Sequence, residues 1–175
     1  MSFVEQSVHG TTYAPGWFLK NNEACTRKTY EFAQNSALVE TAENGGKYVP
    51  MGTPYPTNDA NAIGIAYEDV DVSSGNMPGS VVTKGEVYED RLAITGEAYD
   101  AVTPQSGDNP SEKGWYERSG SAGAYVYSLT TDTTVGDGKT YYEKSDVRLA
   151  SAAKTALEAL GFVFTATTPA FTKPY

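Results

Sequence analysis

The residue types that most often carry out catalysis are scarce in this chain. It has one histidine, His9, and one cysteine, Cys25. A nucleophile activated by histidine would have to use His9, which lies in an extended, polar stretch. Cys25 has no sequence neighbour that would clearly lower its pKa, and such a cysteine is usually a small apolar filler. We therefore predict that the protein is not an enzyme and holds no cofactor.

The segment Gly138-Lys139-Thr140 matches the end of a phosphate-binding loop. That loop needs a glycine five residues before its second glycine, and this position is Thr133. The loop must also lead into a helix, whereas Tyr141-Tyr142 favour a strand. The spacing therefore favours a hairpin turn over residues 135–138.

The acidic run Glu68-Asp69-Val70-Asp71 could bind a hard cation through its carboxylate oxygens. Asp69 and Asp71 would share one face of a strand. The spacing matches no EF-hand loop, however, and one cysteine is too few for a multi-thiolate site. The sequence favours a solvated strand end, and we predict no metal site.

The composition is that of a folded chain of ordinary polarity. Its 175 residues include 13 basic and 22 acidic ones, for a formal charge of −9, and 12% are aromatic. The aromatic content argues against disorder, and the acidic balance argues against binding nucleic acid. The chain has no apolar run of about 18 residues, so we expect no membrane span. Residues 1–6 also lack the basic start and apolar run of a secretory signal.

Residues 1–35 are predicted to form an N-terminal arm, because glycine and proline interrupt them and few packed elements are expected there. The arm contains three aromatic residues, Tyr13, Trp17 and Phe18. Aromatic residues in an irregular arm dock either on the chain's own domain or on a neighbouring protein. The sequence leaves both alternatives open.

Residues 36–97 have the alternating pattern of short strands separated by turns. Strands are expected over 37–40, from Lys47, over 62–67 and over 80–88. Gly64 lies inside one of these strands, which indicates a bulge or a close approach of another backbone.

Residues 98–146 differ in composition and are predicted to form an inserted, three-stranded antiparallel β module. Its aromatic residues Trp115, Tyr125 and Tyr127 could stack on sugar rings. The other interpretation, which we favour, is that they form the core of a unit too small to bury much else.

The last part, residues 147–175, contains the one clear helix and a following strand. Asp146 is predicted to cap the helix, and leucines and alanines repeat at helical spacing from Leu149 to Leu160. Gly161 ends the helix, and Phe162-Val163-Phe164 reads as a strand. Together with the preceding segments, this predicts a mainly β protein (α+β) with one short helix.

The order of these elements resembles the bacteriophage head decoration (capsid cement) proteins of the lambda type. Three segments between residues 45 and 92 carry the resemblance, and the helix with its Gly-led strand, residues 150–164, adds to it. The three segments are Gly46-Lys47-Tyr48-Val49-Pro50, residues 62–71 (Ala-Ile-Gly-Ile-Ala-Tyr-Glu-Asp-Val-Asp) and residues 81–87 (Val-Val-Thr-Lys-Gly-Glu-Val). The resemblance covers about 80 residues, and it implies a small mixed β-barrel or β-tulip-like core over residues 36–97 and 147–175.

The resemblance also implies a structural role on the virion. Proteins of this family bind the outer surface of the expanded head as homotrimers at threefold and quasi-threefold positions. Their partner is the major capsid protein, and their N-terminal segment extends a capsid sheet. The chain would then be made in the host cytoplasm and reside on the outer capsid surface. The corresponding capsid-binding candidates in this arm are Phe3, Val4, Val8, Tyr13, Trp17 and Phe18.

The inserted module departs from that family. Its residues Trp115 to Arg118 and 131–143 resemble a small module of structural proteins from phages of Gram-positive hosts. The alternative function is therefore a head fibre or adhesin whose surface-projecting module binds a host-surface glycan through Trp115, Tyr125 and Tyr127.

Overall fold

A computed structural model describes residues 14–168, which fold into a mainly β protein. Strands account for 36% of the residues, and the described part has one α-helix and no closed barrel. The chain divides into two compact units, and we call residues 14–95 with 148–168 the core unit and Gly96–Val147 the inserted unit. The helix is too short to cross a lipid bilayer, and no other helix of the described chain could.

The core unit is organised around a four-stranded antiparallel sheet with the order β1-β7-β5-β4. The strands are β1 (Thr26–Phe32), β7 (Met77–Lys84), β5 (Gly64–Ala66) and β4 (Pro54–Tyr55). Strand β1 pairs along the length of β7, from Thr26 with Lys84 to Phe32 with Met77. Because β1 belongs to this sheet, the predicted arm over residues 1–35 is not one irregular segment: its residues 26–32 are an edge strand of the core.

The two faces of this sheet are both buried, each under a separate group of apolar side chains. Val81 and Val82 are adjacent on β7 and are both fully buried, so they point to opposite faces. Val81 packs with Phe32 and Val49 on one face, whereas Val82 packs with Phe18 and others on the second face. Burial on both faces is confined to the middle of β7, where two apolar residues follow one another, while Met77 and Lys84 at its ends are exposed.

A three-stranded sheet with the order β2-β3-β6 contributes to the first apolar group. Its strands are β2 (Glu40–Thr41), β3 (Lys47–Val49) and β6 (Val70–Asp71). The predicted strand over 37–40 is wrong except at Glu40. Residues 36–39 form a turn in which the N–H of Val39 donates to the carbonyl oxygen of Ser36 at 3.2 Å. The side chain of Ser36 also accepts a hydrogen bond from Leu38 N–H, so the serine favours this turn.

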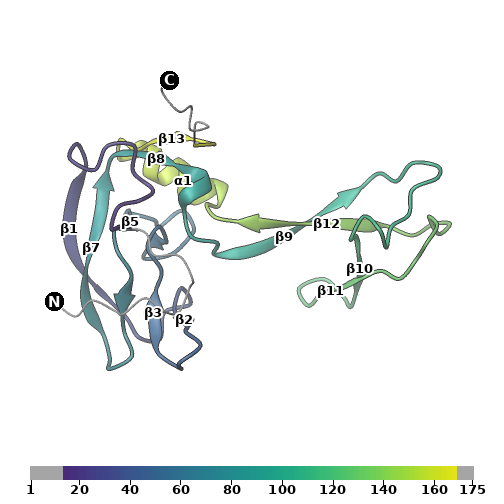
Figure 1. The fold of residues 1–175 in the computed structure, drawn as a ribbon, viewed down its shortest axis with the longest axis horizontal. Helices are drawn as coiled ribbons and strands as arrows, with labels where there is room; N and C mark the ends of the chain where they lie inside the picture. Colours follow the sequence, from purple (N-terminus) through teal and green to yellow (C-terminus); the bar gives the residue numbers. More distant parts are fainter. Residues whose placement is uncertain (1–13, 169–175) are drawn as a thin grey trace, which may run out of the picture. The chain divides into compact units, whose positions relative to one another are not determined.

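The helix and two further strands complete the second apolar group, which also contains Phe18, Ile65 and Val82. Strand β8 (Glu86–Tyr88) leads into a 3₁₀ turn, η1 (Glu89–Arg91), and strand β13 (Val163–Thr165) runs parallel to β8 after the helix α1 (Ser151–Ala159). These elements lie together at the upper end of the core unit in Figure 1. Ala153 and Leu157 are the buried residues of α1, and Gly161 follows with φ of 98°, as the predicted C-terminal stop requires.

The predicted helix cap at Asp146 is wrong. Asp146 lies in a strand, paired with Glu97, and the helix begins only at Ser151 with Ala150 as its N-cap residue. No side chain caps the helix at Ala150, but the backbone N–H of Ala150 donates to the Asn58 side chain at 2.9 Å. The capping preference of aspartate was therefore overridden by strand β12, which continues to Val147.

The inserted unit is a four-stranded antiparallel sheet with the order β11-β10-β12-β9. Its strands are β9 (Gly96–Val102), β10 (Tyr116–Ser119), β11 (Val126–Leu129) and β12 (Tyr141–Val147). The sequence indicated three of them and missed β9, which pairs with β12 from Gly96–Val147 to Val102–Tyr141. This pairing is the reason why the unit begins two residues earlier and ends one residue later than the predicted module.

Gly64 marks the closest approach in the core, as its position within a strand indicated. A Cβ atom at Gly64 would collide with Val81 Cγ1 and with the carbonyl oxygen of Val82. Both atoms belong to β7, so an added methyl group would push β5 and β7 apart where they pair.

We expect Gly64→Ala to lower the free energy of unfolding of the protein by about 2–3 kcal/mol, because the clash is with a neighbouring backbone. Gly96→Ala is the matched control, since nothing lies within 4 Å of a Cβ atom there. Urea denaturation followed by circular dichroism measures both values. Equal stabilities of the two variants would contradict the close packing of β5 on β7.

Candidate functional site

The described part of the predicted arm includes two of its candidate anchors, Trp17 and Phe18, and they have different environments. Phe18 is fully buried in the core unit. Its carbonyl oxygen accepts a hydrogen bond from Tyr88 N–H at 2.9 Å, and Lys20 N–H donates to the Glu86 carbonyl at 2.9 Å. This segment therefore lies along β8, and Phe18 is a core residue rather than an exposed anchor. The other arm candidates, Phe3, Val4, Val8 and Tyr13, lie outside the described residues.

Trp17 is 40% exposed and belongs to an aromatic and cationic group that we call the Trp17 cluster, formed by Trp17, Tyr88 and Arg91. The guanidinium carbon of Arg91 lies 4.1 Å from the Trp17 ring centroid and 4.6 Å from that of Tyr88. Arg91 Nη1 also donates to the Trp17 carbonyl oxygen at 3.0 Å. A guanidinium held between two rings fixes their orientation, so Trp17 is a preorganised surface group.

The last described residues of the chain are fastened beside this cluster. Thr168 N–H donates to Asp90 Oδ2 at 2.7 Å, and the Thr168 hydroxyl donates to Asp90 Oδ1 at 2.9 Å. Arg91 Nε in turn donates to the Thr168 hydroxyl oxygen at 2.8 Å. The backbone hydrogen bond from Thr168 lowers the pKa of Asp90 below its usual range. The turn η1 therefore holds both the first and the last described segments of the core unit.

Two aspartates of the acidic run over residues 68–71 accept hydrogen bonds from backbone N–H groups. Asp69 Oδ1 accepts a hydrogen bond from Met51 N–H at 2.7 Å, and Asp71 Oδ1 accepts one from Ser73 N–H at 2.9 Å. The bond from Ser73 lowers the pKa of Asp71. Across residues 14–168, no group of three or more His, Cys, Asp or Glu side chains is placed to hold a metal ion.

One face of the inserted sheet is covered by Trp115 and Tyr141. They are 2% and 0% exposed, and their ring centroids lie 5.7 Å apart. Trp115 Nε1 donates to Glu143 Oε1 at 3.1 Å, and the Tyr141 hydroxyl donates to Asp132 Oδ2 at 2.7 Å. Trp115 is therefore a core residue of this unit and its ring is not accessible to a ligand.

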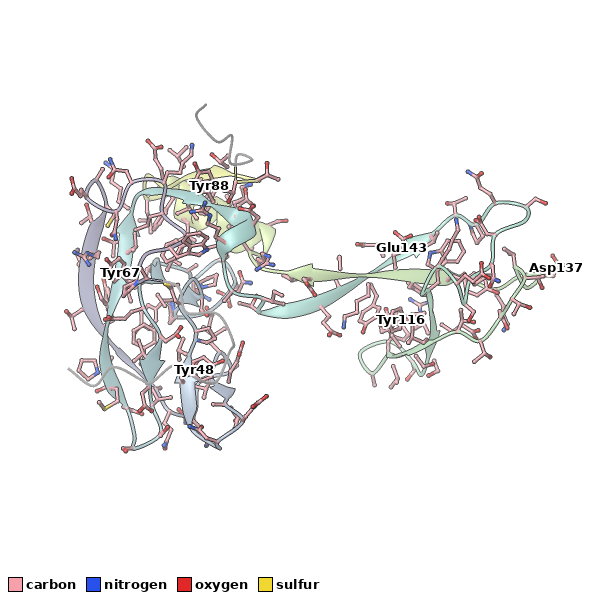
Figure 2. The ribbon with its side chains drawn as sticks, viewed as in Figure 1. Tyr48, Tyr67, Tyr88, Tyr116, Asp137 and Glu143 are labelled. Atoms are coloured by element: carbon pink, nitrogen blue, oxygen red, sulfur yellow. The ribbon has the colours of Figure 1, made fainter. Side chains whose placement is uncertain are left out.

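The opposite face carries four tyrosines that pack against one another: Tyr99, Tyr116, Tyr127 and Tyr142. Tyr127 stacks on Tyr99 with ring centroids 4.0 Å apart and planes 5° from parallel. Tyr116 and Tyr142 meet these two rings edge to face, at 5.2 Å in each case. Tyr116, labelled in Figure 2, comes from β10 within this group of side chains. Tyr127 is thus half-buried by its neighbours, in agreement with the favoured core interpretation.

Tyr125 is the member of the predicted sugar-stacking set that remains accessible. Its side chain is 42% exposed, and the guanidinium carbon of Arg118 lies 4.2 Å from its ring centroid. The same guanidinium lies 5.1 Å from the centroid of Tyr142. Arg118 therefore bridges an exposed ring and a buried ring of the same face.

Beside Arg118 the inserted unit has an open concavity of about 290 Å³. We call it the Arg118 concavity, and it is lined by Glu117, Arg118, Lys139, Thr140 and Tyr142. It lies where β10 and the chain leading into β12 diverge, since these strands pair only at two positions. The sequence singled out Lys139 and Thr140 for their likeness to a phosphate loop, but their proximity to Glu117 follows only from the sheet.

Lys139 is fixed in this concavity by two carboxylates. Its Nζ lies 2.8 Å from Asp132 Oδ2 and 3.3 Å from Glu117 Oε1. The hydrogen bonds to these groups raise the pKa of Lys139, and the Lys139 ammonium lowers the pKa of Asp132. Lys139 is therefore a charged, positioned donor, which differs from the mobile lysine of a phosphate loop.

Asn58 joins the two points where the chain leaves and re-enters the core unit. Its Nδ2 donates to Thr95 Oγ1 at 2.6 Å and to the carbonyl oxygen of Arg148 at 3.3 Å. Its Oδ1 accepts the hydrogen bond from Ala150 N–H. Arg148 Nη1 also donates to the carbonyl oxygen of Leu92. The predicted loop before β5 thus contains the residue that closes the base of the insertion.

No family model, curated protein or solved structure matches this chain. The resemblance to decoration proteins therefore stays a prediction, and any assignment of function depends on the residues and contacts described above.

Replacing Asn58 by alanine removes three hydrogen bonds and leaves the N–H of Ala150 without its acceptor. We expect Asn58→Ala to lower the free energy of unfolding of the core unit by about 1–3 kcal/mol. Asn61→Ala is the control, because the exposed Asn61 side chain bonds only to the neighbouring Asp59. Amide hydrogen exchange at residues 94–96 and 147–150 should accelerate in the first variant alone. Unchanged exchange there would argue against the role of Asn58 at this junction.

Proposed function

We propose that the protein is a structural component of a bacteriophage head that binds the outer surface of the expanded capsid. In this proposal the core unit contacts the major capsid protein and associates as a trimer around threefold and quasi-threefold positions. The inserted unit has no part in this attachment. The protein acts by binding and not by catalysis.

The observation that carries the proposal is that the resembling segments converge. They are separated in sequence by turns and by the 52-residue inserted unit, yet β3, β5 with β6, β7 with β8, and α1 with β13 all pack into the same two apolar groups of the core unit. A shared fold requires that the resembling segments pack together in one domain, and these segments do so. The inserted unit, which has no counterpart in that family, folds as a separate unit.

The core unit also offers surface suited to a protein partner. Trp17, Leu160 and Val163 are 40%, 47% and 54% exposed. Trp17 contacts η1, which directly follows β8, while Val163 lies on β13 beside β8 (Figure 1). Within the described residues β13 pairs only with β8, so its other edge can accept a strand. Strand addition supplies backbone hydrogen bonds, and an aromatic anchor such as Trp17 adds apolar contact.

The aspartates whose pKa values are shifted take part in structural contacts. The pKa values of Asp59, Asp71 and Asp90 are lowered chiefly by backbone N–H groups of nearby turns. Lysine partners lower the pKa values of Asp108 and Asp132 in the same direction. Each carboxylate is held ionised in a structural contact, whereas a general acid requires a raised pKa.

A trimeric decoration protein would stabilise a capsid shell because its three subunits bind the shell at the same time, each through a weak contact. Once one subunit of a ring is bound, binding of the next is intramolecular, and the combined affinity greatly exceeds that of one contact. A protein that binds the assembled lattice but not free subunits shifts the assembly equilibrium towards the shell.

The proposal predicts the abundance of the protein in purified particles of the phage that encodes it. Quantitative mass spectrometry should give close to one copy for each copy of the major capsid protein, because a lattice-wide trimer occupies every threefold position. A handful of copies per particle would indicate a vertex fibre instead. Absence from the particle would overturn the proposal.

The N-terminal segment can be tested separately from the inserted unit. We expect deletion of residues 2–13 to abolish cosedimentation with expanded, undecorated heads, because strand addition by this segment would supply the backbone hydrogen bonds of attachment. The core unit should stay folded, because its two apolar groups are built from residues 18–164. The control replaces residues 97–146 by a two-residue Asn-Gly turn, which is feasible because Gly96 and Val147 are cross-strand partners. This control should bind heads as the full chain does. Full-strength binding by the truncated protein would contradict the role of the arm.

A further inference from the structure

The two edges of the inserted sheet differ in charge. Strand β9 at one edge carries the exposed carboxylates of Glu97 and Asp100, and charges on an edge strand discourage pairing with another chain. Strand β11 forms the other edge, and residues 119–131 around it contain no charged residue. This is a local property, because Gly96–Val147 as a whole contains nine acidic and four basic residues. The edge at β11 is therefore the one without protection by charge.

The backbone groups that β11 directs away from its own sheet belong to Tyr127 and Leu129. In an antiparallel pair, alternate residues direct both their N–H and their C=O groups to the same neighbour. Thr130 N–H donates to the Trp115 carbonyl oxygen at 2.9 Å, so the even-numbered residues of this segment face β10. Tyr127 and Leu129 face the opposite way, and among the described residues no strand pairs with that side of β11.

The side chains of this edge are apolar as well as uncharged. Leu129 and Val126 are 62% and 61% exposed, the highest values among the large apolar residues that the structure describes. Leu129 lies on the same face as Tyr127, two residues away, and so extends the packed tyrosine face to the edge of the sheet. A strand placed along β11 would cover these side chains and bond to the free backbone groups.

The pattern of β11 is complementary to itself. If two copies pair antiparallel about a twofold axis at Ser128, Tyr127 of each copy lies opposite Leu129 of the other. Both outward-facing residues of β11 then exchange backbone hydrogen bonds, and an aromatic and an aliphatic side chain meet on the same face at both positions. A charged partner strand would find no complementary group along residues 119–131. The acidic β9 edge of each copy ends the joined sheet, so the assembly closes at two inserted units.

We propose that β11 is an interaction surface for a second copy of this chain, which joins two inserted sheets edge to edge. The contact consists of one short strand from each copy and falls below the area of a standard interface, so we expect a dissociation constant of about 0.1–1 mM. The proposal goes beyond the proposed function and does not depend on it, because the contact is between copies and is measured in solution.

Cysteine cross-linking tests the register of the two strands. In the proposed pairing the two Ser128 residues lie opposite each other at a non-hydrogen-bonded position, with Cα atoms about 4.5 Å apart, which a disulfide can bridge. In a Cys25→Ser background, Ser128→Cys should therefore form a covalent dimer of chains under mild oxidation. Val126→Cys is the matched control, because it is exposed on the same face of the same strand. The two Val126 Cα atoms would lie about 14 Å apart. We expect at least a tenfold higher dimer yield from Ser128→Cys, and equal yields would overturn the proposal.

Sedimentation equilibrium of the full chain, from about 0.02 to 1 mM, tests the surface without a cross-link. We expect the average mass to rise with concentration, and Leu129→Lys to weaken this association at least tenfold by placing a charge on the edge. Val135→Lys is the matched control, because it makes the same change of charge at an exposed apolar residue of the same unit outside the strands. It should associate as the unchanged protein does, and near-ultraviolet circular dichroism verifies that each variant is folded.

Three results would overturn the proposal. The first is a mass that does not change up to about 1 mM. The second is an equal loss of association in Leu129→Lys and Val135→Lys, which would indicate a general effect of charge. The third is an association that Leu129→Lys leaves intact, which would place the contact between copies on another surface, such as the core unit.

Discussion

The burial of β7 on both faces is the constraint on which the core unit depends. Val81 and Val82 point into different apolar groups, so β7 is the strand that both groups share. Gly64 allows β5 to approach this strand closely, and β1 covers its other edge. Segments that are distant in sequence, such as the stretch containing Phe18 and the helix α1, must therefore be present before the second face is closed.

The same constraint determines which groups remain on the surface. Phe18 is buried in the same apolar group as Val82 and is not available as an anchor, whereas the ring of the adjacent Trp17 is exposed and contacts Arg91. The first and last described segments then meet at η1, where Asp90 and Arg91 bind Thr168. A partner that approaches this end of the core unit meets an ordered aromatic group, so recognition there requires little loss of side-chain entropy.

Elements with buried apolar residues at regular spacing could be predicted from the sequence. Elements that exist only because they pair with a distant strand were missed. Strands β3 and β5, the strand pair β7 and β8, the helix and the close approach at Gly64 followed from apolar spacing and from one glycine. Strand β1 was missed because only Phe32 of its seven residues is buried, as is common for a charged edge strand. Asp146 was assigned as a cap because local preference favours it there, while pairing with β9 keeps it in a strand. The Arg118 concavity could not be predicted, because Glu117 and Lys139 meet only through the sheet.

The inserted unit illustrates how a small sheet limits its own binding surface. A unit of this size must use most of its aromatic residues to cover itself, and Trp115, Tyr141 and the four packed tyrosines do so on its two faces. Tyr125 is the aromatic side chain that this packing leaves most exposed among those of the unit. The Arg118 guanidinium lies 4.2 Å from the centroid of this ring, so the exposed side chain is held in one orientation. Aromatic content by itself therefore does not identify a binding surface in a unit of this size, because it points equally to residues in the core.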